Sequence, residues 1–184
     1  LIQNVQVVNE GKITTRDVLI QGDKIWDILP PNSVNPGWIN QVINGTGKFL
    51  IPGCIDDQVH FREPGLTHKA EIYTESKAAV AGGITSFMEM PNTIPNTVTI
   101  EELEKKFERA REVSLANYSF YLGATHDNVD QIQALDIKHT CGIKIFMGSS
   151  TGNMLVDDEE SLHRIFKHAK TLVATHCEDD HLIA

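Results

Sequence analysis

The sequence predicts an α/β fold in which about five βα units form part of a parallel barrel, preceded by a small β unit. Short β-rich runs fill the first fifty residues. After them, apolar runs recur at intervals of roughly 25 to 35 residues, close to the length of one βα repeat. Helix signatures lie between those runs. We therefore expect a β unit over residues 1–49 and the first part of a barrel domain over residues 50–184.

The N-terminal unit is predicted to contain two β-hairpins. The runs "LIQNVQVVN" and "DVLIQGDKIWDIL" are rich in β-branched residues, with Glu10-Gly11 between them and Gly22-Asp23 inside the second. The segment "PPNSVNPG" that follows is typical of a loop. A unit of this size is too small to be stable alone, so we expect it to pack against another part of the protein.

Five strands of the barrel domain are predicted from its apolar runs, which begin near Leu50, Ile84, Tyr118, Ile143 and Leu172. A closed eight-stranded barrel takes about 250 residues. The chain opens on Leu and stops just after the fifth run. We therefore expect it to be the N-terminal part of a longer protein.

The helix between the second and third runs has the clearest start signal. Thr99 and Glu102 have the spacing of a capping box, and Leu103, Phe107 and Ala110 follow on one helical face. A second helical face is predicted further along the chain, formed by Leu162, Ile165, Phe166 and Ala169. The glycine pair Gly82-Gly83 is predicted to end the first helix.

Composition narrows the class of protein. The chain has 184 residues, 41% of them hydrophobic, and a formal net charge of -9. That charge argues against nonspecific binding to nucleic acid or anionic membranes, and no run approaches the ~18 apolar residues of a membrane helix. Three widely spaced cysteines favour buried thiols in a reducing compartment over disulfides. We expect a cytoplasmic protein with a small-molecule partner.

Polar residues follow or interrupt four of the predicted strands: His60, Arg62, Asn92, Lys144 and His176. Ligands bind at the carboxyl ends of strands in α/β folds, so these side chains are expected to converge on one face. Each of these residues could instead have a purely structural role. A single histidine at a strand end is more often structural than a ligand, and an asparagine after proline is often a turn residue.

Two charged residues stand within apolar runs. Lys144 in "CGIKIFMG" must either extend to the barrel mouth or be a neutral amine, because a buried lysine has a depressed pKa. A neutral amine can capture carbon dioxide as a carbamate, whose two oxygens can bridge two metal ions. Glu89 in "SFMEMPN" needs a buried partner that the sequence does not name. His126 in "GATHDN" could face the substrate, although a loop position explains it better.

Four segments, in this order and spacing, resemble the amidohydrolase superfamily and within it the dihydroorotase family: "IPGCIDDQVHFREPG", "MEMPNTIPNT", "GIKIFMGSSTG" and "ATHCEDD". The resemblance covers essentially the whole chain. It implies a (β/α)8 TIM-type barrel with a small β-sandwich built from both chain ends, of which the first fifty residues would supply one piece. The segment "MPNT" is more similar to dihydroorotases than to allantoinases or dihydropyrimidinases.

The resemblance also implies a zinc site of one or two ions. The family's His-x-His motif falls on Gln58 and His60, its carbamylated lysine on Lys144, and its next metal histidine on His176. Gln58 departs from the motif, and because an amide oxygen is a poorer zinc ligand than imidazole, the metal position at Gln58 is expected to be weaker or empty, so the site holds one ion or two.

Arg62 and Asn92 match the family's ligands for the substrate carboxylate. The reaction implied is reversible hydrolysis of dihydroorotate to N-carbamoyl-aspartate in pyrimidine biosynthesis. The family's proton-shuttling aspartate is expected beyond the end of this chain, which alone should be inactive. In the alternative structural interpretation, Arg62 pairs with Glu63 or Asp57 at the surface.

Two other functions stay open. The chain could come from a noncatalytic dihydroorotase-like protein, or from a cyclic amidohydrolase of the allantoinase or dihydropyrimidinase type. The presence of Lys144, His176, Arg62 and Asn92 together favours an enzyme, because a protein freed from catalysis has no physical need for them. Unpaired barrel edges also allow a homo-oligomer.

Overall fold

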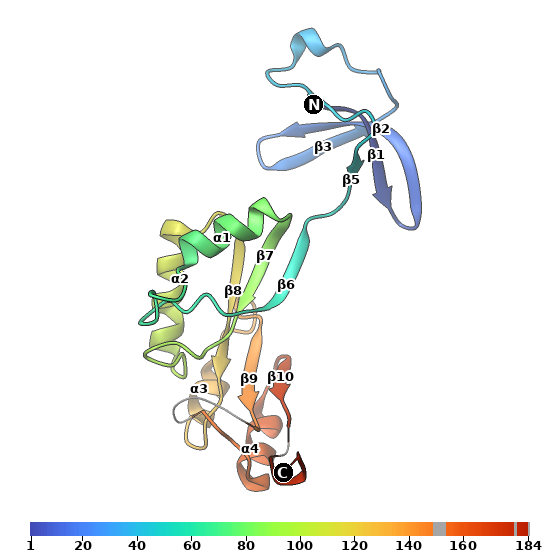
Figure 1. Cartoon of the computed structure of the whole chain (residues 1–184). Coiled ribbons are helices and arrows are strands. Elements are labelled where there is room, and N and C mark those ends of the chain that lie inside the picture. The colour runs from blue at the N-terminus through green and yellow to red at the C-terminus, as the bar shows by residue number, and fades with distance from the viewer. Residues whose placement is uncertain (149–153, 179, 184) are drawn as a thin grey trace. The chain divides into compact units, whose positions relative to one another are not determined.

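A computed structural model describes residues 1–148, 154–178 and 180–183. The chain divides into two compact units, Leu1–Gly53 and Cys54–Ala184 (Figure 1). Residues 149–152 of the segment "GIKIFMGSSTG" and Asp179 of "ATHCEDD" lie outside the described residues.

The first unit is a five-stranded sheet. Its strands are β1 (Ile2–Asn9), β2 (Lys12–Gln21), β3 (Lys24–Leu29), β4 (Ile43–Asn44) and β5 (Phe49–Leu50). The first three form an antiparallel meander, and the two short strands pair in parallel with β1. Both predicted hairpins are confirmed. Glu10 and Gly11, at the first turn, have φ of 48° and 73°, as a tight hairpin turn requires.

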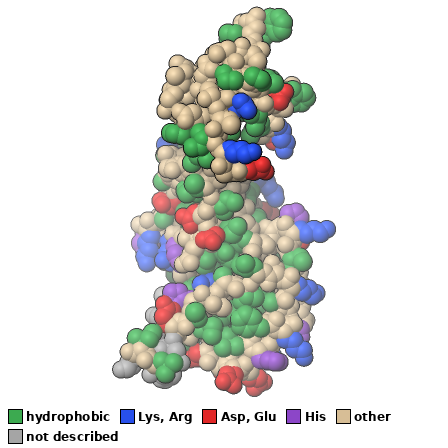
Figure 2. Space-filling view, turned by 90° about the vertical axis from the view of Figure 1, so that its right-hand side faces the viewer, with side chains coloured by type: hydrophobic (Ala, Val, Ile, Leu, Met, Phe, Trp, Pro, Cys, Tyr) green, Lys and Arg blue, Asp and Glu red, His purple; other side chains and the backbone are tan. Residues whose placement is uncertain are grey.

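Few side chains of the first unit are fully buried. Val5 and Val18 are, while Trp26 and Trp38 are 67% and 86% exposed. A 3₁₀ turn, Pro36–Trp38, carries the second of these tryptophans. Exposed hydrophobic side chains are visible on both units (Figure 2). The small core agrees with the expectation that a unit of this size needs further packing.

The second unit is built on a parallel sheet whose strand order is β10-β9-β8-β7-β6 (Figure 1). These strands are β6 (Cys54–Val59), β7 (Ile84–Glu89), β8 (Asn117–Gly123), β9 (Gly142–Phe146) and β10 (Val173–His176). Each strand pairs with the next in sequence, as in a barrel, so the predicted α/β fold is confirmed. The strand expected near Leu50 begins at Cys54, because Leu50 pairs with β1 in the first unit.

A helix follows each of these strands, and the first, second and fourth of these helices lie where the sequence predicts them. They are α1 (Ile72–Ala81), α2 (Ile100–Val113), α3 (Val129–Ala134), α4 (Glu159–His168) and the short α5 (Asp180–Ile183). Thr99 caps α2 by accepting a hydrogen bond from the Glu102 N–H, as predicted. Gly82 ends α1 and donates to the carbonyls of Ala78 and Ala79. No helix in the described ranges combines the length and apolar character that a bilayer crossing requires.

The core lies between the helices and one face of the parallel sheet. Phe120 and Leu122 of β8 and Ile143 and Ile145 of β9 belong to it. Because side chains alternate along a strand, Lys144 projects to the opposite face of the sheet. That inner face is where a barrel would place its ligands.

The expectation of three buried thiols is wrong. Cys54 and Cys177 are exposed, and Cys141 is half-buried; all three are free thiols. Cys54 opens the edge strand β6 and Cys177 follows the opposite edge strand β10, and the outer side of each edge strand has no partner strand among the described residues.

Candidate active site

Lys144 lies in the middle of β9 and is only 3% exposed. Its Nζ atom sits 4.9 Å from the centre of the Phe146 ring. Within the described ranges, no carboxylate forms an ion pair with it. Burial lowers the pKa of the Lys144 amine, while the nearby charges of Cys177 and Glu178 act in the other direction. The site therefore favours a neutral amine more than an ordinary surface lysine does.

His60 follows β6 directly and is half-buried. Its Nδ1 atom lies 2.9 Å from the Oδ1 atom of Asn92. If Nδ1 donates that hydrogen bond, Nε2 carries the lone pair that a metal would take. Burial lowers the pKa of His60, as do the positive charges of Arg62 and Lys144. The neutral imidazole is the form that binds metal.

Arg62 and Asn92 lie together at the carboxyl ends of neighbouring strands. The Arg62 guanidinium donates a long hydrogen bond, 3.4 Å, to the Asn92 carbonyl. Both residues line a pocket of about 470 Å³. The rest of that pocket comes from the two loops: Leu66, Lys69, Thr93, Ile94, Pro95 and Asn96.

The surface pairing considered for Arg62 does not occur within the described residues. Glu63 pairs instead with Arg109, at 2.6 Å, and Arg62 forms no ion pair in the described ranges. The backbone of Arg62 has a φ of 66°, in the left-handed region that non-glycine residues rarely adopt. Such conformations concentrate at ligand-binding sites.

His176 is the last residue of β10, directly beside Phe146 of β9. Its Nε2 atom lies 2.8 Å from the Glu178 carboxylate, so Nδ1 is left for another ligand. Gln58, in β6, is exposed, and its side chain makes no hydrogen bond among the described residues. The structure thus joins His60 and Arg62 to Asn92 by direct contact and brings the charge of Lys144 close enough to lower the pKa of His60, whereas no hydrogen bond among the described residues joins Gln58 to them.

Sequence reasoning missed the partner of Glu89. Lys106 of α2 lies 2.7 Å from the Glu89 carboxylate, with each side chain 1% exposed. Neither Glu89 oxygen accepts a well-aligned hydrogen bond among the described residues, so the attraction is chiefly electrostatic. The helical spacing could have indicated this partner, because Lys106 lies on the same buried face of α2 as Leu103 and Ala110.

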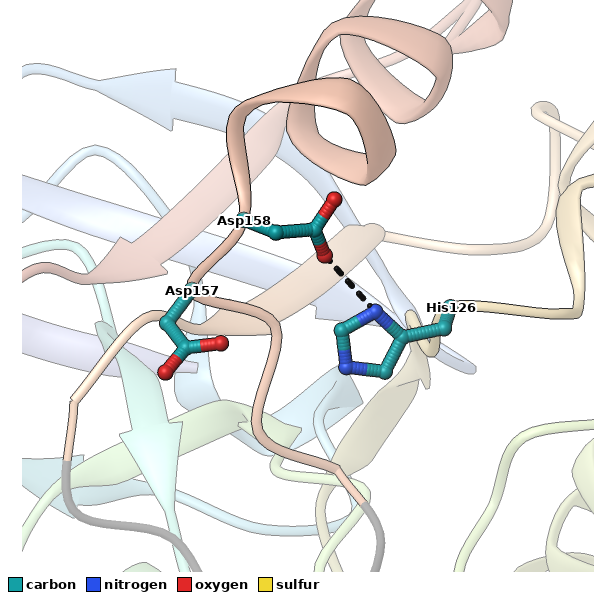
Figure 3. Close-up of side chains that lie close together, drawn as sticks. All are labelled: His126, Asp157 and Asp158. Atoms are coloured by element: carbon teal, nitrogen blue, oxygen red, sulfur yellow. Dashed lines mark ion pairs between the residues drawn. The ribbon is translucent and has the colours of Figure 1, made fainter.

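A second cluster lies outside this site. Figure 3 shows His126 pointing toward Asp158, with Asp157 beside them; the possible ligand atoms of all three lie within 4.8 Å of one another. The His126–Asp158 distance is 2.8 Å, and Asp158 caps α4 by accepting from the Ser161 N–H. All three side chains are exposed. A helix cap with a paired loop histidine explains this arrangement without a metal.

The sequence profile of the family described as Dihydro-orotase-like matches residues 47–184. The chain belongs to the dihydroorotase-like family. It is 35% identical to the dihydroorotase of Methanosarcina mazei, covering 97% of this chain and 39% of that protein. It is 33% identical to the dihydroorotase of Listeria welshimeri, covering 100% of this chain and 43% of that protein. The chain therefore spans about two fifths of the length of these dihydroorotase relatives.

Solved structures of the superfamily share the fold. L-Hydantoinase (dihydropyrimidinase) from Arthrobacter aurescens superposes with a TM-score of 0.89 at 26% identity, over 99% of this chain and 41% of that one. An inactive dihydroorotase-like domain of a Chaetomium thermophilum multifunctional protein superposes with a TM-score of 0.58 at 18% identity, over 72% of this chain and 39% of that one. The second likeness concerns the fold alone.

Proposed function

We propose that this chain supplies the first part of a metal-dependent cyclic amidohydrolase that hydrolyses dihydroorotate reversibly to N-carbamoyl-aspartate, a step of pyrimidine biosynthesis. The observation that carries the proposal is the contact among His60, Asn92 and Arg62 at the ends of β6 and β7, close to a buried lysine. The dihydroorotases among the relatives support this substrate over other cyclic amides. A cytoplasmic location and a homo-oligomer belong to the same proposal.

The residues present fit a metal site. Lys144 is a buried amine without a carboxylate partner in the described ranges, and its lowered pKa favours the neutral form that reacts with carbon dioxide. We assign the resulting carbamate, His60 and His176 as ligands of one or two zinc ions. Bound zinc would polarise the ring carbonyl and lower the pKa of a water molecule to about 7. Gln58, an exposed amide, would be the weakest of the ligands.

Substrate binding is assigned to Arg62 and Asn92. Dihydroorotate is a cyclic amide that carries a carboxylate, and a guanidinium binds carboxylates through two parallel hydrogen bonds. The Oδ1 atom of Asn92 is already engaged by His60, which leaves its Nδ2 group to donate to the substrate. His60 thus connects the carboxylate-binding pair with the metal ligands.

The proposal is tested on the full-length protein with zinc content and turnover measured together. Arg62→Met should lower kcat/KM for dihydroorotate by about thirtyfold, the equivalent of losing charge-assisted contacts worth roughly 2 kcal/mol, with bound zinc unchanged. Arg62→Lys is the matched control that keeps the charge but not the bidentate fork. Equal loss of zinc and turnover would make Arg62 a structural residue. Faster turnover of dihydrouracil or hydantoin than of dihydroorotate would favour the dihydropyrimidinase type.

Gln58 supports a second candidate, a noncatalytic dihydroorotase-like protein. Residues 58 and 60 alternate onto one face of the extended chain, so an imidazole at 58 would point the same way as His60. If Gln58 is a degraded ligand, Gln58→His should raise the zinc bound per chain. If the site is instead built around glutamine, the added ring should lower turnover without added zinc. A zinc-loaded protein that turns over none of these substrates would support the noncatalytic candidate.

A further inference from the structure

The loop that carries Arg62 is tied to helix α2 through the next residue. The Oε1 atom of Glu63 lies 2.6 Å from Nε of Arg109. Its Oε2 atom accepts a hydrogen bond of 2.9 Å from the N–H of Ile72, the first residue of α1. The Glu63 side chain is 11% exposed, and a shielded carboxylate held at both oxygens by such contacts has little freedom.

A second tie lies one turn earlier on the same helix. Lys106 forms the buried ion pair with Glu89 and also donates to the carbonyl of Met90, at 3.3 Å. Met90 stands two residues before Asn92. The Met90 N–H donates in turn to the carbonyl of Val59, the last residue of β6, at 3.0 Å, so Met90 joins the two strand ends that lead to the Arg62 and Asn92 loops. Lys106 therefore holds the backbone at the point where the loops of both carboxylate-binding residues begin.

Two features indicate that these ties hold a specific loop conformation. Lys106 and Arg109 are three residues apart, so they lie on one side of α2. Arg62 has its φ at 66°, a conformation that persists in a non-glycine residue only where the surroundings impose it. The anchored loop also contacts the Asn92 loop, because the Ile94 N–H donates to the Pro64 carbonyl at 3.1 Å.

We propose that Lys106 and Arg109 are positioning residues for recognition of an anionic substrate group, acting through the Met90 backbone and through Glu63 on the loops that carry Asn92 and Arg62. This inference rests on the proposed role of Arg62. Neither cation reaches the substrate: Lys106 is buried behind the sheet, and Arg109 is occupied by Glu63. Together they fix where the guanidinium points, and so set the preference for cyclic amides that carry a carboxylate.

A purely structural role for the same residues makes a different prediction. If Lys106 and Arg109 only help the unit to fold, substituting them should lower the affinity for charged and uncharged ligands alike. If they position Arg62, the loss of affinity should be confined to ligands that carry a carboxylate. Orotate and uracil form a suitable pair of probes, because they share the ring and differ in the carboxylate.

The test uses Arg109→Gln in the full-length, zinc-loaded protein, with Arg109→Lys as the matched control. The half-exposed guanidinium can be replaced without opening the core. We expect orotate affinity to fall by roughly fivefold in Arg109→Gln, uracil affinity to change less than twofold, and zinc content to stay constant. Hydrogen exchange of residues 60–72 should rise in the ligand-free variant and rise less in Arg109→Lys.

Hydrogen exchange and orotate affinity together distinguish a failure of the positioning role from a failure of the proposed function. Unchanged hydrogen exchange in Arg109→Gln, or unchanged orotate affinity where the parent binds orotate, would overturn the positioning role. If the parent does not bind orotate, the proposed function fails, and the exchange measurement alone decides whether α2 fixes the loop. The double variant Glu89→Leu/Lys106→Met, which keeps the packing without buried charge, should show the same selective loss of orotate affinity.

Discussion

Replacing Lys106 by methionine is the most informative test of the second unit's stability. Lys106 and Glu89 form an ion pair at 2.7 Å with both side chains 1% exposed. The lysine stem packs in the core, and its ammonium lies 4.9 Å from the centre of the Phe120 ring. Methionine fills a similar volume, so Lys106→Met removes the charge while leaving most of the packing.

The loss of unfolding free energy in Lys106→Met depends on two opposing contributions, the attraction within the pair and the cost of burying its charges. At an effective dielectric constant of 20, two unit charges 2.7 Å apart attract by about 6 kcal/mol. Desolvation of two buried ions costs several kcal/mol each, so the intact pair is close to neutral in net stability. Removing only Lys106 leaves the cost of burying Glu89 without its compensation. We expect Lys106→Met to destabilise the unit by about 3–5 kcal/mol, and Glu89→Leu/Lys106→Met by much less.

Urea unfolding of the three proteins, followed by circular dichroism, measures these differences. Glu89 should also become protonated in Lys106→Met, since burial raises its pKa and the opposing lysine is gone. The single variant should therefore lose more stability as the pH rises above the usual range for a carboxyl group. A single variant within about 1 kcal/mol of the parent, or a double variant as unstable as the single, would refute this account of the pair.

Three further outcomes are expected. Thr99→Ala should cost about 1 kcal/mol in urea unfolding by removing the cap of α2, whereas Thr99→Ser should be nearly neutral. The pKa of Asp158 is lowered, chiefly by the hydrogen bond from the Ser161 N–H, so the stability that this carboxylate contributes should be lost as the pH falls through its pKa in the folded protein. Asp158→Asn caps the helix without titrating and should abolish this part of the pH dependence of the urea midpoint. Gly65→Ala should destabilise more than Gly83→Ala, because both have positive φ but only at Gly65 would a Cβ meet a neighbour, the Ile94 carbonyl. Equal midpoints for the two glycine variants would show that the two loops are not in close contact.

Much of the second unit's architecture could be predicted from the chain because its signals are local. A threonine cap, an apolar helical face and a glycine stop each act over a few residues, and α2 and α1 begin and end where those signals lie. The strand expected at Leu50 failed because an apolar run does not say which sheet it joins. Leu50 pairs with β1, a contact that depends on tertiary structure. Helix α3, with six residues, is too short for a periodic pattern.

The site could be predicted only where chemistry coincides with a strand end. His60, Arg62 and Asn92 are predicted as site residues in this way, and in the structure His60 and Arg62 each contact Asn92. The supporting ion pairs were not found, because Glu63–Arg109 joins residues 46 positions apart and nothing in either segment names the other. Charged residues on the buried face of a helix are the signal to look for in such cases.

In the proposed function, recognition and metal binding depend on different parts of the second unit. Arg62 and Asn92 stand on loops tied to α2, whereas Lys144 and His176 belong to β9 and β10. His60 contacts Asn92, and its pKa is lowered by burial first and also by the charge of Lys144. A weak ligand at Gln58 would therefore impair the metal without disturbing the pocket that takes the carboxylate. Such a protein would still bind its substrate after losing turnover, so binding of orotate cannot by itself distinguish the enzyme from a noncatalytic relative, and zinc content must be measured with it.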